Sequence, residues 1–353
     1  MNNRKYYLDN LEAFTILLFF PFHIFMIYNN WGEDFYIRGE ALLIPSELSR
    51  IIGIWIWPLL LATAGISSRY ALEKRNAGIY VKECVSNLLL PLIFGVLLVV
   101  PVQPYIAGLY FNGESSYFDF FTRFTDMTGY DGAFTLAHLW FLLYLFLFSM
   151  VSLPFTTRYK NKGKGMFANK ASLIVVVSIG LLPCIVESDV FKVFQIYGKS
   201  TLRYFVFFLL GHFLLANENL LKKLEKRRFL LLGMTVLFTG FMIFILEGEF
   251  FEMASWLSIL TVLGMAQRYL NFNGKTTDYL SKSSFGVFLF HQSWIIVAAF
   301  FVFKITDSPI LQIPLIFLSS IILTYLTCEI CKRVFIFRRM FGLKKNFDLK
   351  EQL

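Results

Sequence analysis

Long apolar runs, separated by short polar stretches, recur along the whole chain. The first extends from Leu8 to Trp31 and carries one ionisable side chain, His23, beyond its midpoint. A helix needs about 20 apolar residues to cross a bilayer, and most of these runs approach that length. The pattern therefore predicts an all-α integral membrane bundle of about ten transmembrane helices. The expected spans are 11–30, 50–67, 85–103, 136–157, 172–187, 203–217, 229–247, 250–268, 284–304 and 310–331.

The basic residues predict the orientation of these helices. With the N-terminus in the cytoplasm, the segments on the cytoplasmic side hold 26 of the 33 Lys and Arg residues. Loops rich in Lys and Arg stay on the cytoplasmic side. We therefore expect a multi-pass protein of the cell (plasma) membrane with both termini cytoplasmic. Most of the basic residues behind the net charge of +9 lie in these loops, where they set the topology, and this argues against a nucleic-acid partner.

Composition indicates a single integral membrane domain over residues 1–353, because 57% of the residues are hydrophobic and only 16% are charged. A basic tail, at about 332–353, could lie on anionic membrane lipid as an amphipathic segment. Cys328 and Cys331 form a C-x-x-C at the end of the last helix. No second ligand pair accompanies them, so helix packing is favoured over a zinc or redox site.

Two longer loops, 29–50 and 104–135, fall on the outer side in this topology. They combine acidic side chains with many Tyr, Phe and Asn residues. Such a mixture can line a carbohydrate-facing surface, and it can equally be an interfacial aromatic belt with solvated acids. The acidic residues are Glu33, Asp34, Glu40, Glu47, Glu114, Asp119, Asp126 and Asp131.

The chain has only four histidines, and all of them fall in or at the ends of predicted helices. Ionisable side chains within a membrane span are costly and often functional. The topology puts His23 towards the outside, His138 at the outer end of its helix, and His291 about two turns from the inside. They need not meet, so no metal site is expected. His212 is interpreted as structural.

His23 is the best candidate for a general base. An apolar helix favours the neutral imidazole, which is the form that can take a proton from a hydroxyl as that hydroxyl attacks an acyl carbonyl. Glu12 lies on the same helical face but roughly 16 Å away along the axis, too far to orient the imidazole. The motifs G-x-S-x-G, Walker A and G-x-G-x-x-G are absent, which disfavours a serine hydrolase or a nucleotide-driven pump.

Four segments together resemble the acyltransferase 3 family. They are YYLDNLEAFTILLFFPFH, PLLLATAGISSRYALEKR, AHLWFLLYLFLFSMVSLPF and SKSSFGVFLFHQSWIIV. The resemblance extends from Leu8 to about Val297. It is greatest to the branch that lacks an extra soluble domain, which includes succinyl transferases of periplasmic glucans.

This resemblance implies a membrane-bound O-acyltransferase. Family members move acyl groups, commonly acetyl or succinyl, from cytoplasmic acyl-CoA to a hydroxyl of an extracytoplasmic carbohydrate or small molecule. The implied donor substrate is acyl-CoA, with no tightly bound cofactor, and the implied setting is O-acetylation or a similar acylation in the cell envelope. His23 matches the family's first-helix histidine and is the expected catalytic residue. The expected cavity-lining residues are Glu12, His138, Trp140, His291 and Gln292. The expected donor-binding residues are Arg69, Lys74, Arg75 and Lys82.

Three positions depart from the family pattern. Where the family has an arginine eleven residues before the histidine, this chain has Glu12; where it has Arg-x-x-Arg before a proline, this chain has Cys84 and Asn87. Glu for Arg reverses the sign of an interaction worth about 4 kcal/mol at 4 Å and an effective dielectric of 20. The basic residues at 69–82 could compensate. The enzyme could also use another donor, or the chain could be an inactive family member.

The alternative from another functional class is a transporter of a small polar molecule, with the histidines as a proton relay. An inverted repeat would favour a transporter. The sequence contains none that we can recognise.

Overall fold

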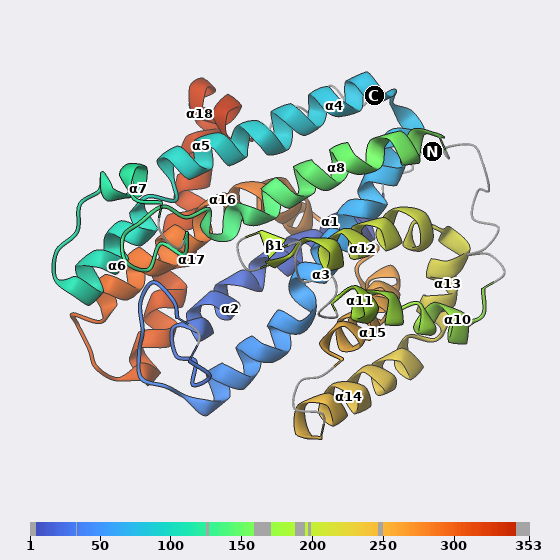
Figure 1. Ribbon diagram of the computed structural model, residues 1–353, viewed down its shortest axis with the longest axis horizontal. Coiled ribbons are helices and arrows are strands. Elements are labelled where there is room, and N and C mark those ends of the chain that lie inside the picture. The colour runs from blue at the N-terminus through green and yellow to red at the C-terminus, as the bar shows by residue number, and fades with distance from the viewer. Residues whose placement is uncertain are drawn as a thin grey trace. The chain divides into compact units, whose positions relative to one another are not determined.

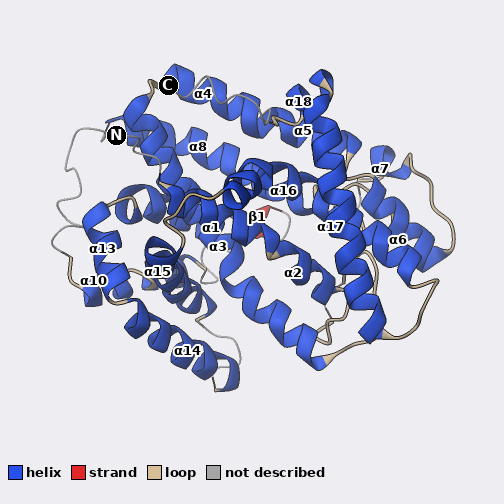
Figure 2. Cartoon of the chain, turned by 180° about the vertical axis from the view of Figure 1, so that it is seen from behind, coloured by secondary structure: helices blue, strands red, loops and turns tan. Residues whose placement is uncertain are grey.

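The computed structural model describes residues 5–32, 34–124, 127–158, 171–187, 195–196, 199–245 and 250–343. Its regular structure is almost entirely helical (Figures 1 and 2), so the predicted all-α class is confirmed. Two short strands, β1 (Gln195–Ile196) and β2 (Lys199–Ser200), pair antiparallel. The chain forms two compact units that alternate along the sequence. The first unit is Met1–Glu12, Gly53–Cys84 and Tyr144–Gly274; the second is Ala13–Ile52, Val85–Leu143 and Lys275–Leu353.

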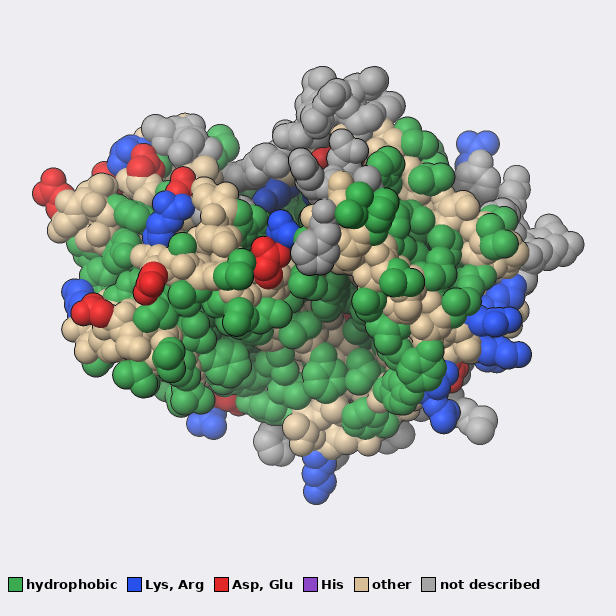
Figure 3. Space-filling view, turned by 90° about the horizontal axis from the view of Figure 1, so that it is seen from below, with side chains coloured by type: hydrophobic (Ala, Val, Ile, Leu, Met, Phe, Trp, Pro, Cys, Tyr) green, Lys and Arg blue, Asp and Glu red, His purple; other side chains and the backbone are tan. Residues whose placement is uncertain are grey.

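Six helices in the described part of the chain are long and apolar enough to cross a membrane, and they match six of the predicted spans. A bent pair, Thr201–Leu215 with Glu218–Lys226, would make a seventh. The predicted count of ten is therefore not confirmed. Hydrophobic side chains are spread widely over the face drawn in Figure 3, as expected for a surface that meets lipid. The six spans are Tyr6–Met26, Leu43–Lys74, Ala77–Asn112, Ala137–Arg158, Lys275–Val302 and Pro309–Arg333.

Of the other four predicted spans, three are short or bent, whereas the fourth, 250–268, is a continuous helix (Phe251–Tyr269) that is not among the six. The apolar helices Leu173–Val186 and Arg228–Ile243 fall below the length of the six spans. The predicted span 203–217 ends in a bend of 96°. There the Asn217 side chain accepts a hydrogen bond from the Leu220 backbone N–H at 3.0 Å and so begins a new helix. Apolar runs alone do not reveal such a cap.

The first unit is built mainly from helices of the middle of the chain. Helix α1 (Tyr6–Leu17) begins in it, and parts of α3 (Leu43–Lys74) and α8 (Trp140–Arg158) belong to it. The remaining elements are α4 (Ala77–Cys84), α10 (Leu173–Ser178), α11 (Leu181–Val186), α12 (Thr201–Leu210), the π-helical turn η4 (Gly211–Leu215), α13 (Glu218–Lys226), α14 (Arg228–Phe244) and α15 (Phe251–Tyr269).

Two glycines let helices of the first unit approach closely. A Cβ added at Gly65 of α3 would lie 2.0 Å from the Phe208 carbonyl oxygen, and one added at Gly211 would lie 2.0 Å from the Ala62 carbonyl oxygen. Small residues at helix contacts are common in membrane proteins because they allow backbones to touch. The packing of α3 against α12 and η4 therefore depends on both glycines.

Replacing Gly211 by alanine is expected to destabilise the folded protein by about 1–3 kcal/mol, because the new methyl group overlaps the Ala62 backbone. The measurement is unfolding in detergent by heat or denaturant. Gly233→Ala is the matched control, since nothing lies within 4 Å of a Cβ at that position of α14. Equal midpoints for the two variants would contradict the close approach.

The second unit is centred on α16 (Lys275–Val302), which packs against α2 (Phe19–Met26), α6 (Val102–Asn112) and α17 (Pro309–Arg333) (Figure 1). Side-chain hydrogen bonds join these helices. Gln103 Nε2 donates to Ser293 Oγ at 2.9 Å, and Trp294 Nε1 donates to Thr327 Oγ1 at 2.9 Å. The other elements are the π-helical turn η1 (Val85–Leu89), α5 (Leu90–Leu98), α7 (Asp119–Thr122), the 3₁₀ turn η2 (Ala137–Leu139) and α18 (Phe335–Met340).

The C-x-x-C cysteines lie in this second unit, on α17. Both are buried and free, and a Cβ at Gly286 of α16 would lie 3.0 Å from Cys328 Sγ. Cys328 thus packs directly against the neighbouring helix. The basic tail continues through α18, and its residues 344–353 lie outside the described part, as do Glu33, Asp126 and the basic loop at 159–170.

Candidate active site

His23 lies on α2, just after a break in the first span. Pro21 has no backbone N–H to donate to the Leu17 carbonyl, and the helix is interrupted at Leu18 between α1 and α2. The break separates α2 from α1 and starts a short helix that is apolar except for His23, its one ionisable residue. His23 is 6% exposed.

Three of the four histidines come together in the second unit. The ring centroid of His291 lies 5.3 Å from that of His23 and 5.0 Å from that of His138. His138 is 2% exposed and His291 is fully buried. We call these three residues the histidine cluster. In the described part of the chain, no three His, Cys, Asp or Glu side chains are placed to hold a metal ion.

The sequence-based expectation placed these histidines at different depths and did not predict that three of them meet. It rested on a ninth span beginning near residue 284, with His291 two turns inside. Helix α16 instead begins at Lys275, so His291 lies near the middle of a 28-residue helix. There it packs beside α2, which carries His23. Because charged and polar residues open α16, the apolar run alone underestimated its length.

Backbone contacts define which ring nitrogens of the cluster carry protons. His291 Nδ1 lies 3.1 Å from the Val287 carbonyl oxygen and 2.8 Å from that of Phe288, so Nδ1 donates and Nε2 keeps a lone pair. His138 Nε2 lies 3.2 Å from the Leu289 carbonyl oxygen, which leaves the lone pair on Nδ1.

Four nitrogens of the cluster have no hydrogen-bond partner among the described residues. They are both nitrogens of His23, Nδ1 of His138 and Nε2 of His291. Buried polar atoms are normally paired, so unpaired ones need an explanation such as catalysis or an absent ligand. Two of these atoms are lone-pair acceptors, and His23 in its neutral form offers one donor and one acceptor. The cluster is thus suited to a ligand hydroxyl.

Aromatic rings enclose His23. Phe19 of α2 and Phe35 of the following loop lie nearly parallel to the imidazole, with ring centroids 5.7 Å and 5.8 Å away. The loop is held to the end of α2, because Gly39 N–H donates to the Ile27 carbonyl at 2.8 Å and Leu42 N–H donates to the Tyr28 carbonyl at 2.9 Å. Phe35 therefore rests on His23 as part of a loop that is anchored to the end of α2 at Gly39 and Leu42.

A row of rings continues from Phe35 into the second of the two long loops, 104–135. Tyr36 lies 5.5 Å from Phe35 and 5.1 Å from Tyr130, measured between ring centroids. The Tyr36 hydroxyl donates to the Thr128 carbonyl at 3.2 Å. The loop that covers His23 is thus bound to the loop that carries Asp131.

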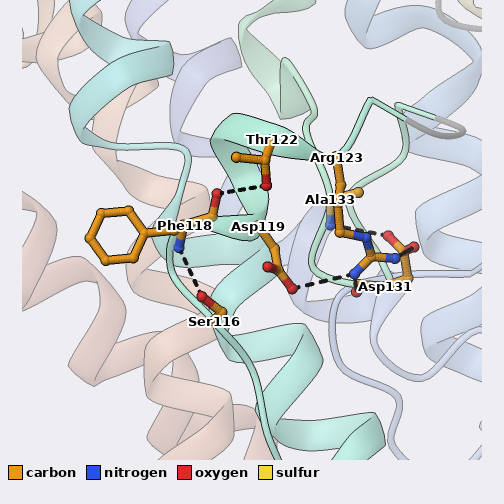
Figure 4. Close-up of polar contacts among 7 residues, drawn as sticks. All are labelled: Ser116, Phe118, Asp119, Thr122, Arg123, Asp131 and Ala133. Carbon is orange, nitrogen blue, oxygen red and sulfur yellow. Dashed lines mark hydrogen bonds and ion pairs between the residues drawn. The ribbon is translucent and has the colours of Figure 1, made fainter.

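That second loop forms a cavity with polar walls and a volume of about 520 Å³, which we call the polar cavity. Arg123 lies between two carboxylates: its Nη2 is 2.6 Å from Asp131 Oδ2 and its Nη1 is 3.5 Å from Asp119 Oδ2 (Figure 4). Asp131 is also fixed by the Ala133 backbone N–H at 3.0 Å. The lining residues are Asn112, Glu114, Ser115, Ser116, Asp119, Arg123 and Asp131.

The polar cavity has a net negative lining, because Arg123 offsets only part of the charge of three acidic side chains. The buried hydroxyl oxygen of Ser115 has no partner among the described residues. Sequence reasoning noted the acids of this loop but missed Arg123 and Ser115. The i,i+4 spacing of Asp119 and Arg123 was a signal for the ion pair, whereas the contact with Asp131 depends on how the loop returns.

Comparison with known proteins identifies the family. A family model for an acyltransferase domain matches residues 5–329, a range that includes the whole histidine cluster. The chain belongs to this acyltransferase family. Similar proteins include glucans biosynthesis protein C of Escherichia coli O139:H28 (strain E24377A / ETEC) and of Escherichia coli K12, each 24% identical over 333 residues. These matches cover 82% of this chain and 81% of the relatives. No solved structure matches.

Family membership confirms the resemblance drawn from the four sequence segments, and the chain is a multi-pass membrane protein of the acyltransferase class. The residues that the resemblance singled out are spread over both units. Trp140 and Gln292 are buried in the second unit, where Trp140 follows η2 directly and the Gln292 side-chain oxygen has no partner among the described residues. Glu12 is exposed on α1, in the first unit.

The basic residues expected to bind the donor lie at the end of α3 and on α4, in the first unit. Two of them are paired with carboxylates: Arg69 Nε is 3.1 Å from Glu73 Oε1, and Arg75 Nε is 2.7 Å from Glu83 Oε1. The other two, Lys74 and Lys82, are exposed. Their ammonium groups are the ones most open to an incoming anion.

The remaining positions of interest differ in environment. Cys84, one of the positions expected from the resemblance to depart from the family pattern, is buried at the end of α4, whereas Asn87 is exposed in η1. His212 is buried in η4 of the first unit, where its ring meets Phe213 edge-on with centroids 4.7 Å apart. It is not part of the histidine cluster.

Proposed function

We propose that the protein transfers an acyl group, acetyl or succinyl in kind, from cytoplasmic acyl-CoA to a hydroxyl of an extracytoplasmic carbohydrate or small molecule. The observation that carries the proposal is the histidine cluster: three buried imidazoles with four unpaired nitrogens, inside a chain of the acyltransferase family. His23 is the general base.

In the proposed reaction, a neutral His23 nitrogen takes the proton of the acceptor hydroxyl as its oxygen attacks the thioester carbonyl carbon. The tetrahedral intermediate collapses, the carbon–sulfur bond breaks, and the thiolate of CoA takes the proton from His23. The products are an ester and CoA. Because His291 Nε2 keeps a lone pair, it can accept a hydrogen bond and so favour the charged form of His23 during the reaction.

Access to His23 is part of this proposal. Since His23 is only 6% exposed, the acceptor hydroxyl reaches it when the Phe35 loop moves aside. Closing that loop again would exclude water, which would otherwise hydrolyse the acyl donor.

For the donor, support comes from the four basic residues at 69–82. Phosphate oxygens of CoA would be attracted to the exposed Lys74 and Lys82, with Arg69 and Arg75 nearby along the chain. These residues would supply the positive charge that arginines provide in other members of the family. The replaced positions, Glu12, Cys84 and Asn87, are the features that favour the second candidate, a family member that binds acyl-CoA without transferring its acyl group.

Two observations support a carbohydrate acceptor. The similar Escherichia coli proteins are named for the biosynthesis of glucans. The polar cavity, in the same unit as His23, offers carboxylate, amide and hydroxyl groups that suit the hydroxyls of an uncharged sugar, and its net negative charge disfavours an anion.

The test is to incubate the purified protein in lipid nanodiscs with acyl-CoA labelled in the acyl group and with a neutral glucan. Formation of a labelled ester on the glucan is the expected result. Binding of labelled acyl-CoA without ester formation would favour the non-catalytic candidate. Absence of both binding and transfer would favour the transporter interpretation.

Replacing Arg123 by glutamine is expected to raise KM for the acceptor about tenfold with little change in kcat. Asp119 and Asp131 would lose their shared cation and repel each other, which disorders the polar cavity but leaves His23 untouched. Arg50→Gln is the matched control, because it breaks one surface ion pair, with Glu47, outside the cavity. An unchanged KM for Arg123→Gln would exclude the polar cavity from acceptor binding.

A further inference from the structure

The second unit contains an apolar cavity of about 380 Å³, distinct in its lining from the polar cavity. Helices α5, α6, α16, α17 and α18 bound it. We call it the apolar cavity, and its walls include Leu98, Val102, Trp294, Val297, Phe337 and Phe341.

The two hydroxyl groups and the indole N–H in this wall are hydrogen-bonded within the protein. Ser293 Oγ donates to the Val99 carbonyl at 3.1 Å and accepts from Gln103. Thr327 Oγ1 accepts from Trp294 Nε1 and donates to the Leu323 carbonyl at 2.8 Å. No polar group of these side chains is left to bind a polar ligand, so the cavity is suited to hydrocarbon.

Helix α18 combines the features of a segment that lies at a membrane surface. Phe335 and Ile336 are 56% and 63% exposed, and the guanidinium groups of Arg338 and Arg339 lie over the Phe335 ring. Arg333, Arg338 and Arg339 form no ion pair with a carboxylate among the described residues. Exposed apolar side chains next to unneutralised arginines are typical of interfacial helices that meet anionic lipid.

The end of α18 is fixed against the wall of the apolar cavity. Phe341 is buried and meets Phe290 of α16 edge-on, with centroids 5.2 Å apart. The chain then turns at Gly342, whose φ is +60°, and a Cβ there would lie 3.0 Å from Pro91 Cγ. The arginines are therefore held on the helix that forms one wall of an apolar space.

We propose that the apolar cavity holds one acyl chain of an anionic membrane phospholipid, whose phosphate is bound by Arg338 and Arg339. The hydrocarbon of the acyl chain suits the apolar wall of the cavity. The negative charge of the headgroup suits the two guanidinium groups, which no carboxylate neutralises among the described residues. This lipid site is separate from acyl transfer and does not depend on it. The rival occupant with the same chain chemistry is a long-chain acyl-CoA.

Trp294 provides a probe inside the cavity. The experiment uses two sets of nanodiscs made of phosphatidylcholine. One set contains a small fraction of phosphatidylglycerol with brominated acyl chains, and the other contains the same fraction of phosphatidylcholine with brominated acyl chains. Bromine quenches tryptophan fluorescence on contact. Subtracting the emission of a Trp294→Phe variant isolates Trp294. We expect brominated phosphatidylglycerol to quench Trp294 several-fold more than brominated phosphatidylcholine at the same fraction.

Charge variants separate specific binding from bulk contact with lipid. Arg339→Gln is expected to lower the apparent affinity for brominated phosphatidylglycerol about fivefold, since each basic residue near an anionic surface contributes about 1 kcal/mol. Lys304→Gln is the control. It removes the same charge at a position just after the C-terminal end of α16. A second variant, Val297→Phe, fills the cavity and should abolish the lipid-specific quenching while Arg338 and Arg339 remain.

Equal quenching by the two lipids, or an unchanged affinity for phosphatidylglycerol in Arg339→Gln, would overturn the proposal. Quenching by a brominated long-chain acyl-CoA that phosphatidylglycerol does not displace would assign the cavity to a donor chain instead, and would also overturn it. None of these readouts requires acyl transfer, so they test the lipid site independently of the proposed function.

Discussion

Replacing His23 by alanine is expected to lower the rate of acyl transfer by about 10²–10⁴-fold, the range typical of a lost general base. The variant should still fold and enter the membrane. Neither nitrogen of His23 has a hydrogen-bond partner among the described residues, so truncation leaves no buried polar atom newly unpaired. What is lost structurally is the contact with the rings of Phe19 and Phe35. The measurement is the initial rate of labelled ester formation.

His212→Ala is the control for this prediction. His212 is buried as deeply as the cluster histidines but lies in the first unit, on η4. If the loss of a buried imidazole affects folding alone, both variants should be less stable, and neither should show a selective decrease in the rate of acyl transfer. Equal rates for His23→Ala and the unmodified protein would remove His23 from the mechanism. Equal losses in both variants would indicate a general folding defect.

Replacing His291 by phenylalanine is expected to lower kcat about 10- to 100-fold with a smaller effect on KM. The phenyl ring keeps the packing between Phe19, Phe20 and α16, but it removes the lone pair on Nε2 that faces the cluster. The charged form of His23 then loses an acceptor at the moment when it forms. A hydrogen bond to a charged group is worth about 1.5–3 kcal/mol, which gives this range of rates.

Rescue by glutamine distinguishes this positioning role from simple packing. His291→Gln restores an acceptor near the Nε2 position and should recover part of kcat, whereas a purely structural role predicts that phenylalanine, with its aromatic ring, is tolerated better. The steady-state kinetics of both variants are the measurement. Higher kcat for His291→Phe than for His291→Gln would refute an acceptor role for His291.

The sequence predicted the helical class and six membrane spans because those helices are long, continuous and apolar. The count of ten is not confirmed, and one reason is a short-range cap: Asn217 starts a new helix where the chain bends by 96°. The apolar run also placed the start of the helix that carries His291 too late, because polar residues from Lys275 onward belong to the same helix. Periodicity and hydropathy do not separate a polar helical turn from a loop.

For the site, the sequence singled out His23, His138 and His291 but not their proximity. That proximity depends on helix packing, which residue spacing within one helix cannot give. The contact of Phe35 with His23 and that of Arg123 with Asp131 depend on how two long loops fold back. Only the i,i+4 spacing of Asp119 and Arg123 is a local pattern; the other contacts depend on the course of the loops.

The central claim, transfer of an acyl group across the membrane through His23, is tested most directly by separating the two substrates. The protein is reconstituted in vesicles in one orientation, with labelled acyl-CoA on the side of the basic 69–82 segment and a neutral glucan on the other. The account predicts labelled ester on the glucan for the unmodified protein and about 10²–10⁴-fold less for His23→Ala. Ester formation only when both substrates share one side, or at the same rate in His23→Ala, would contradict it.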